Sequence, residues 1–409
     1  MTLRQFVREV KANENLILPN SWRVLSSIND LTANQRRILF ANVNCPFHSF
    51  EFLAALENSG SIGQGTGWIP EYLLCEDSDD KYGLLIGYQK TDSYGEYVFD
   101  WAWADAFHRN GIHYYPKYTI GIPFSPVPCR KLVGNLTLSM NEALSIAFQY
   151  AESNQYSGVH LLFAEKEIND AKNFITRKGH QFHWFNNRNI AKLDAIDECL
   201  LQNESNQFKS FTDFLSILTA RKRKMILKER SKVKSHFSFS WKSGEQITND
   251  ELNAFYLSYQ STYIKRGRSG YLSLAFFQEI FKSLATKVRL LLCFKEDEIV
   301  ATALYFVDED TLYGRYWGAL AEFDYLHFEA CYYQGIEYCI KHKIKRFNPG
   351  TQGEHKIARG FKPVETTSLH SIFLQSFHDA IERFCNEESV HNEAYISACS
   401  ERLPYKLDL

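Results

Sequence analysis

The sequence predicts a mixed α/β (α+β) protein built of two lobes, and three observations lead to this prediction. The chain has 409 residues, which is about twice the length of an ordinary domain. Hydrophobic residues make up 45% of it and charged residues 23%, as is typical of globular proteins. Strand-like and helix-like hydrophobic patterns alternate along the chain. Together these observations exclude a wholly disordered chain.

The first half of the chain is expected to hold three strands and two helices. The second helix should end at Gly179, because glycine is favoured just after the last helical turn. One acidic turn of Asp and Ser residues joins the first two strands. In chain order, these are the strands Tyr72–Glu76 and Tyr82–Lys90, the helix Met140–Asn154, the strand Gly158–Ala164 and the helix Glu167–Lys178.

The second half begins with three strands that two acidic turns separate, a pattern that predicts an antiparallel meander. A helix, a strand and a short helix ending at Gly360 are expected to follow. In chain order these elements are Val288–Phe294, Ile299–Val307, Thr311–Trp317, Tyr325–His342, Arg346–Asn348 and Glu354–Arg359.

Both halves share one order of helix, strand, short helix, arginine and glycine, which indicates a duplicated lobe. We therefore expect a first lobe over residues 21–207 and a second over 236–409, joined by a basic helical linker over 208–235. Residues 1–20 are expected to form an N-terminal extension with amphipathic helical character. Only the second copy carries a polar glycine-rich loop, so the active site is expected there.

The bulk composition narrows the class of protein further. The net charge of −2 gives no global signature of a nucleic-acid-binding protein. The nine cysteines lack the spacing of a zinc site, so no metal is expected, and their use fits a reducing compartment. The chain shows no signal peptide and no apolar run long enough to span a membrane. We therefore expect a cytoplasmic protein.

The stretch Arg221–Lys234 is strongly basic and has helical spacing. One interpretation is a solvated helix face. The other is a strip that binds a polyanion such as cofactor phosphates or tRNA. Arg221, Lys224 and Lys228 would share one face of the helix, whereas Lys222, Arg223 and Arg230 would point elsewhere.

The segment Asn348–Phe361 is the most informative for chemistry. Its glycines, including Gly353, permit tight turns, and a short helix opens directly after them. Lys356 and Arg359 would share a face of that helix and could hold a phosphate or carboxylate. The alternative is a purely structural polar turn. The segment matches neither a Walker loop nor the usual coenzyme A pyrophosphate loop.

A second group of candidates lies just before this segment. His327 and Glu329 open an aromatic-rich helix, where burial would raise the pKa of a carboxylate toward that of a useful base. Stabilisation of the first helical turn is the competing interpretation. Strand alternation places Tyr313, Arg315 and Trp317 on one face, which suggests a polar cleft. In the first half, Asp100 and Asp105 lie among tryptophans and are expected to be structural.

A series of motifs resembles a bacterial family of predicted N-acyltransferases in the FemAB-like branch of the GNAT fold, often labelled peptidoglycan biosynthesis or recognition proteins. The series covers nearly all of residues 45–385, and the chain departs from the family pattern at Asn348–Thr351. In order, the motifs are FEFL (50–53), LENSGS (56–61), GWIP (67–70), GEYVFDWAWAD (95–105), YYPK (114–117), PFSP (123–126), ARKRK (220–224), LYGRYWG (312–318), LHFEACYY (326–333) and QGEHKIARG (352–360).

This resemblance implies tandem GNAT-like lobes and an acyltransferase of EC class 2.3 that moves an acyl or aminoacyl group to an amine, such as a cell-wall precursor. Such an enzyme, for example an N-acetyltransferase, would use an acyl-CoA such as acetyl-CoA as its donor and would need no metal. For this activity we assign catalytic roles to Glu329, Glu354, Tyr313 and Tyr316. Substrate or cofactor binding is assigned to Gln352, Gly353, His355, Lys356, Arg359, Arg315, His327 and Trp317.

Two alternative functions remain open from the sequence. An aminoacyl-tRNA would replace the thioester donor if the basic stretch Arg221–Lys234 binds it. A non-catalytic protein would instead bind a wall precursor or another amine without turning it over.

Overall fold

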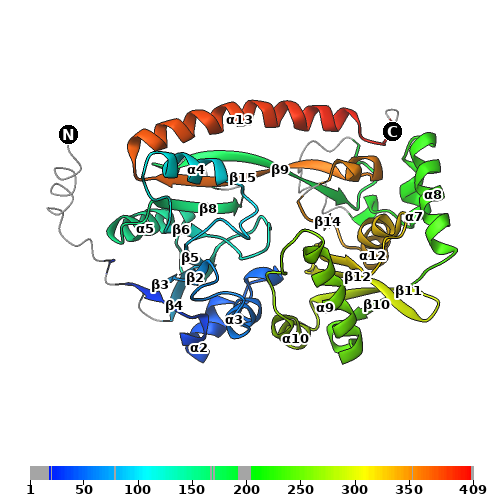
Figure 1. Ribbon diagram of the computed structural model, residues 1–409, viewed down its shortest axis with the longest axis horizontal. Helices are drawn as coiled ribbons and strands as arrows, with labels where there is room; N and C mark the ends of the chain where they lie inside the picture. The colour runs from blue at the N-terminus through cyan, green and yellow to red at the C-terminus, as the bar shows by residue number, and fades with distance from the viewer. Residues whose placement is uncertain are drawn as a thin grey trace. The chain divides into compact units, whose positions relative to one another are not determined.

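The computed structural model describes residues 18–19, 21–77, 80–165, 168, 171–191, 204–351 and 353–406. Apart from Leu18 and Pro19, the predicted N-terminal extension lies outside these residues, and so does Gln352. Strands and helices alternate along the chain, and the predicted mixed α/β class is confirmed (Figure 1). No helix in the described ranges combines the length and hydropathy required to cross a bilayer.

The chain forms two compact units, and each is assembled from three separate stretches of sequence. The first unit comprises Met1–Val43, Ile62–Arg177 and Thr367–Glu387, and the second comprises Asn44–Ser61, Lys178–Thr366 and Glu388–Leu409. By contrast, each predicted lobe, at 21–207 and at 236–409, was one continuous stretch of sequence. The difference arises because short stretches far along the chain complete each unit, which hydrophobic periodicity does not reveal.

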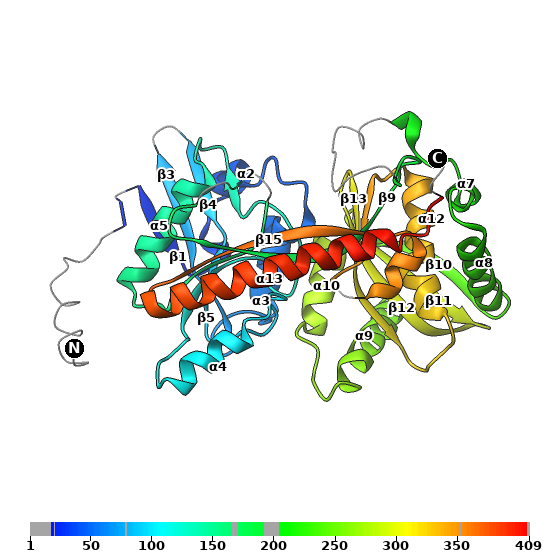
Figure 2. The ribbon, with the colours of Figure 1, turned by 90° about the horizontal axis from the view of Figure 1, so that it is seen from above.

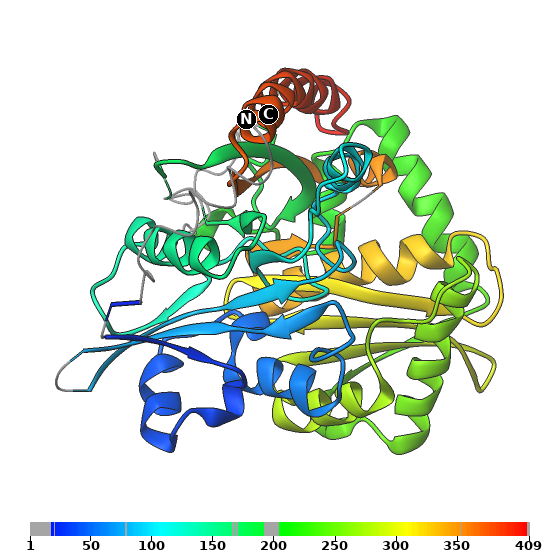
Figure 3. The same cartoon turned by 60° about the vertical axis from the view of Figure 1, so that its left-hand side comes forward.

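Unit 1 contains two sets of strands. An antiparallel sheet has the order β1-β3-β4-β7, and helix α2 packs against β4 and β7 (Figure 3). The other set has the order β15-β8-β6-β5-β2, in which β6 and β8 are parallel. The elements are β1 (Trp22–Leu25), α2 (Ala33–Leu39), β2 (Trp68–Pro70), β3 (Tyr72–Asp77), β4 (Lys81–Leu85), β5 (Gly87–Lys90), α4 (Trp101–Arg109), β6 (Lys117–Ile120), β7 (Leu132–Gly134), α5 (Met140–Ser153), β8 (Gly158–Ala164) and β15 (Lys362–Ile372).

Two local predictions in the first half were wrong. The expected strand Tyr82–Lys90 is divided at Ile86 into β4 and β5, which belong to different sheets. The expected helix Glu167–Lys178 falls partly on undescribed residues, and from Ile175 onward the chain is the strand β9 (Ile175–Phe185). Gly179 therefore lies inside a strand rather than at the end of a helix, and none of the described residues of the expected helix is helical.

Unit 2 is built on strands in the order β10-β11-β12-β13-β14-β9. The predicted meander is present, because β11, β12 and β13 pair antiparallel in sequence. Strand β14 then pairs parallel to β13 after a helical crossover. The strands are β10 (Ser238–Ser243), β11 (Val288–Lys295), β12 (Glu298–Val307), β13 (Thr311–Ala319) and β14 (Arg346–Asn348).

Helices cover both faces of this sheet. Helix α9 packs against β12 and β13 on one face, while α12 lies on the other (Figures 1 and 3). Helices α7 and α8 pack beside the crossover helix, so the predicted linker over 208–235 is part of this unit (Figure 2). The helices are α3 (Phe50–Asn58), α7 (Phe211–Ser216), α8 (Ala220–Lys234), α9 (Asn249–Ile264), α10 (Leu274–Ser283), α11 (Leu326–Phe328), α12 (Gln334–His342) and α13 (Gln375–Glu401), of which α13 begins in unit 1.

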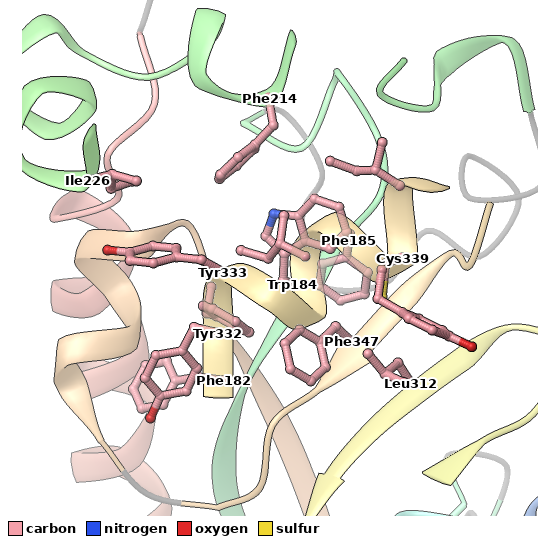
Figure 4. Packing of buried hydrophobic residues seen from close by; sticks show 14 of the residues in the cluster. Phe182, Trp184, Phe185, Phe214, Ile226, Leu312, Tyr332, Tyr333, Cys339 and Phe347 are labelled. Atoms are coloured by element: carbon pink, nitrogen blue, oxygen red, sulfur yellow. The ribbon is translucent and has the colours of Figure 1, made fainter. Parts of the chain in front are cut away.

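The expected helix over 325–342 is interrupted by one π-helical turn, η5 (Glu329–Tyr333), between α11 and α12. The short helix predicted over 354–359 is the 3-10 helix η6 (Glu354–Arg359), and Gly360 ends it with a φ of 92°. Around them lies an aromatic-rich core in which Trp184 and Phe185 approach Phe347 (Figure 4). Burial of this core stabilises the elements on which the glycine-rich turn rests.

Candidate active site

Hydrogen bonds fix the glycine-rich turn between β14 and η6. Arg315 on β13 donates from Nη1 to the main-chain and side-chain oxygens of Asn348, each at 3.3 Å. The Gly350 amide donates to Asn348 Oδ1 at 3.1 Å. In the parallel pair β13–β14, Tyr313 is opposite Asn348, which brings Arg315 beside the turn. Gly350 and Gly353 have φ values of 93° and 119°, which favour glycine.

Lys356 is a buried ammonium group at this turn. Its residue is 2% exposed, and its Nζ donates to the Gly350 carbonyl oxygen at 2.8 Å. Within the described ranges, no carboxylate contacts it. Burial lowers the pKa of Lys356 to about 7, and the nearby Arg315 guanidinium contributes to the shift. Because buried charges are ordinarily paired, Lys356 is a position where a ligand anion would be stabilised.

Two imidazoles flank this ammonium. The hydroxyl of Tyr332 lies 2.7 Å from His355 Nε2, and the rings of His327 and His355 have centroids 6.0 Å apart. Burial lowers the pKa values of both histidines to about 4, and neighbouring Lys356 and Arg359 act in the same direction. Both imidazoles are therefore neutral at pH 7. We call Arg315, His327, His355, Lys356 and Arg359 the basic cluster.

Aromatic rings line one side of the basic cluster. The ring of Trp317 lies 5.6 Å from that of His327, and the ring of Tyr332 lies 5.3 Å from it. The guanidinium of Arg359 stacks at 3.5 Å over the centroid of Phe328. Aromatic rings and cationic groups are therefore in direct contact at the basic cluster.

Arg359 already has an ionic partner. Its Nη2 donates to Glu229 Oε1 of α8 at 2.7 Å, and its Nη1 donates to the His355 carbonyl oxygen at 2.7 Å. Tyr333 also donates its hydroxyl to Glu229. The charge of Arg359 is therefore balanced within the fold, and this residue links η6, which carries His355 and Lys356, to α8.

Glu329 lies elsewhere than the sequence suggested. Its carboxylate is fully buried and accepts hydrogen bonds from Arg230 of α8 and from Gln334 Nε2, the latter at 2.9 Å. Arg230 also binds Glu337 at 2.7 Å. Both oxygens of this carboxylate are thus engaged by partners within the fold. The geometry thus favours a structural role for Glu329 over the predicted base.

The other predicted catalytic groups also have partners outside the basic cluster. Glu354 is exposed and accepts a hydrogen bond from Tyr395 of α13 at 2.9 Å. Tyr313 donates its hydroxyl to Asp308 at 2.7 Å. The ring of Tyr316 is buried against Tyr259, with ring centroids 5.4 Å apart. The structure thus brings together the predicted binding residues, apart from the undescribed Gln352, more closely than the predicted catalytic ones.

Sequence reasoning missed two buried polar side chains on β9. Gln181 Oε1 accepts from Asn348 Nδ2 at 3.3 Å and lies 3.0 Å from His183 Nε2. Burial, together with Arg346, Arg315 and Lys356, lowers the pKa of His183 well below its usual range. The alternation of polar and aromatic residues from Gln181 to Phe185 was the signal, which the expected helix over 167–178 obscured.

Helix α8 separates its charges by face. Glu229 and Arg230 are buried in the pairs described above, along with the apolar Ile226 and Val233. Five basic side chains point to solvent, and at least the first three share one face, as predicted. The exposed residues are Arg221, Lys224, Lys228, Lys232 and Lys234.

A second buried charge cluster lies within unit 1. Lys117 Nζ donates to Glu96 Oε2 at 2.9 Å and also binds Asp100. Tyr114 donates its hydroxyl to Asp100 at 2.6 Å. These residues come from the two motifs at 95–105 and 114–117. Asp105, by contrast, is exposed and paired with Arg109.

A family model named FemAB-like, described as peptidoglycan biosynthesis or recognition, matches residues 27–407. A search of curated proteins finds no match. Among solved structures, that of FemX is similar with a TM-score of 0.49 and 12% identity, covering 86% of this chain and 99% of that one. L-PGS from Bacillus licheniformis gives a TM-score of 0.47 and 12% identity, covering 81% and 94%. A tandem GNAT protein from the clavulanic acid biosynthesis pathway gives 0.41 and 10%, covering 86% and 98%.

Proposed function

The chain belongs to the FemAB-like family, and from this premise we propose that it is a transferase that moves an acyl or aminoacyl group from an activated donor to an amine. A peptidoglycan precursor is the acceptor class that the family description favours. The observation that carries the proposal is the buried Lys356 ammonium at a glycine-rich turn, since it offers a cationic group to an anionic substrate.

The reaction requires two changes of bonding and two proton transfers. The amine nitrogen forms a bond to the carbonyl carbon of the donor, and the bond from that carbon to the leaving oxygen or sulfur breaks. The amine loses one proton, and the leaving group takes up one proton. Negative charge develops on the carbonyl oxygen in between, so fixed positive groups lower the barrier.

We assign roles by charge state and position. Lys356 and Arg315 hold the anionic part of the substrate, a donor phosphate or an acceptor carboxylate. His355 is neutral at pH 7 and exposed, and its contact with Tyr332 orients its ring, so it accepts the proton of the amine. His327 and Trp317 form the wall beside it. Glu329 has no catalytic role in this scheme.

The test is the turnover of Lys356 variants with a panel of amine acceptors and both donor classes. Lys356→Met should lower kcat/KM at least about 100-fold, a loss of about 2.7 kcal/mol, and Lys356→Arg should retain part of the activity. The exposed Lys282 of α10 provides the matched control, because Lys282→Met should leave turnover unchanged. Wild-type turnover in Lys356→Met with an unchanged melting temperature would refute the proposed site. Ligand binding without product under every donor would instead favour a recognition protein.

The donor is a separate question, and one observation favours an aminoacyl-tRNA over acyl-CoA. Helix α8 presents basic residues to solvent, including Lys224 and Lys228 on one face. Charge reversal at both positions should weaken the binding of charged tRNA and flatten its dependence on salt. Tight binding of acetyl-CoA without retention of tRNA would identify the thioester as the donor.

A further inference from the structure

A pocket of about 490 Å³ lies in unit 2 beside the C-terminal half of α12, apart from the basic cluster. Residues from α12, from β10 and from the segment that leads into α7 line it. Its volume falls in the range of small-molecule pockets. None of its lining residues belongs to the basic cluster, so the proposed transfer reaction does not account for it.

Aromatic rings form the walls of this pocket. Trp241 of β10 lies against Tyr338 of α12, with ring centroids 4.7 Å apart. His342 stacks on the same tyrosine at 4.2 Å, and Phe211 adds a third wall. Arg289 donates to the Tyr338 hydroxyl at 2.7 Å, which fixes the orientation of that ring. Rigid flat walls of this kind favour a planar aromatic ligand.

The charge at the pocket is positive. Lys209 and Lys341 are exposed at its rim, and neither forms an ion pair with any residue in the described ranges. The one carboxylate of the lining, Glu337, accepts from Arg230 at 3.0 and 2.7 Å. Arg230 balances only one of its two partners, Glu337 and Glu329, but the two lysines outweigh the remaining negative charge and leave the rim net positive, which would attract an anion.

From these walls and this rim we propose that the pocket binds a small planar aromatic ligand that carries an anionic group, of which a nucleoside monophosphate is the representative. The ring would lie against Trp241 and Phe211, the half-buried rings of the lining, and the phosphate or carboxylate would face Lys209 and Lys341. The inference is independent of the transfer reaction, because the lining shares no residue with the basic cluster.

The experiment is calorimetric titration of the full chain with AMP, with adenosine and with inorganic phosphate. AMP should bind saturably with a Kd below about 1 mM, and each half-ligand at least tenfold more weakly. Lys209→Glu and Lys341→Glu should each weaken AMP at least tenfold, whereas Lys282→Glu, on an exposed face of α10, should not. Lys356→Met should keep the binding of AMP, which separates this pocket from the transfer site.

Tryptophan fluorescence supplies a second readout. AMP should quench the emission of the wild type, and Trp241→Phe should lose this quenching while it retains a ring to bind. Three outcomes would overturn the proposal: no saturable binding of AMP up to about 10 mM, binding of phosphate as tight as that of AMP, or equal affinities for the wild type and the charge-reversal variants.

Discussion

The guanidinium of Arg230 holds the carboxylate of Glu329 with two nitrogens, Nε to Oε2 at 3.0 Å and Nη2 to Oε1 at 2.8 Å. Both residues are buried, and 99 positions of sequence separate them. The pair ties α8 to the π-helical turn that precedes α12. The position of this turn, and with it that of His327 and Tyr332, thus depends on a salt bridge to a residue of another helix, α8.

Removal of Arg230 should be costly, because it leaves Glu329 buried without its ionic partner. We expect Arg230→Met to lower the free energy of unfolding by about 3–5 kcal/mol, measured by urea denaturation. The double variant Arg230→Met/Glu329→Gln should recover part of the loss. A single variant within about 1 kcal/mol of the wild type would contradict this account.

Substitution of Glu329 separates the structural role from the catalytic one. Glu329→Gln should reduce stability but leave the turnover per folded molecule within about threefold of wild type, because the proposed scheme assigns it no proton. A loss of about 100-fold in kcat without a change in KM or melting temperature would return the base role to this residue.

The stability of the protein should rise with pH at Lys356. Its pKa is about 7 in the folded chain and 10.5 as the ordinary value, so between these limits the unfolded chain binds more protons. The free energy of unfolding therefore increases with pH across this window, by up to about 1.4 kcal/mol per pH unit. The full cost of the buried ammonium applies below pH 7.

The measurement is urea denaturation between pH 6.5 and 9.5 for the wild type, Lys356→Met and Lys282→Met. The free energy of unfolding of the wild type should rise with pH relative to that of Lys356→Met, while that of Lys282→Met should follow the wild type. Parallel curves for the wild type and Lys356→Met would show that the group titrates alike in both states.

Binding of an anionic substrate at Lys356 should take up protons. A nearby anion favours the charged ammonium and raises its pKa, so at pH 8 the complex holds more protons than its separated parts. Calorimetry in two buffers with different ionisation enthalpies measures this uptake. Lys356→Arg should bind without it, since arginine stays protonated. Equal uptake by both proteins would place the titrating group elsewhere.

The buried cluster of unit 1 gives a further test. Lys117→Met leaves Glu96 and Asp100 without their shared cation and should cost about 3–5 kcal/mol. Glu96→Gln should cost less, and its effect should depend on pH. Burial raises the pKa of Glu96 to about 7, so the wild type loses stability as the pH rises from 4.5 to 7. Gln at this position should remove that slope, and an unchanged slope would contradict the assignment.

Gly360 should resist replacement. Its φ is 92°, and an added Cβ would lie 3.0 Å from both the Phe214 ring and the Tyr405 hydroxyl. Gly360→Ala should therefore cost about 1–3 kcal/mol from backbone strain, with a further cost from crowding. Gly267 has a φ of 70° but nothing within 4 Å, so Gly267→Ala should cost only the strain. Equal melting temperatures for the two variants would show that the crowding relaxes freely.

Local patterns predicted the parts of the fold that depend on neighbouring residues. The meander β11–β12–β13 followed from alternation and acidic turns, and η6 with its glycine end followed from the segment after Asn348. The candidate site residues His355 and Lys356 were also selected this way, because one short segment contains them. Periodicity failed at β9, where a strand begins among residues that also fit a helix.

The partners of charged residues could not be predicted. Glu329 looked like a base because its helix is aromatic-rich, but its role depends on Arg230, which comes from a helix far back in the sequence. Glu229 likewise binds Arg359 across 130 positions. Such pairs are set by tertiary packing, for which a single sequence has no periodic signal.

The interleaved assembly of the two units sets the order in which the protein can be completed during synthesis. The core of the first unit includes Leu369, Ile381 and Cys385, which the ribosome adds long after the earlier stretches of the same unit. The earlier stretches of this unit must therefore wait, with part of their apolar surface open, until residues 367–387 have emerged. A nascent chain of this kind would depend on chaperones for longer than one whose domains close in sequence order.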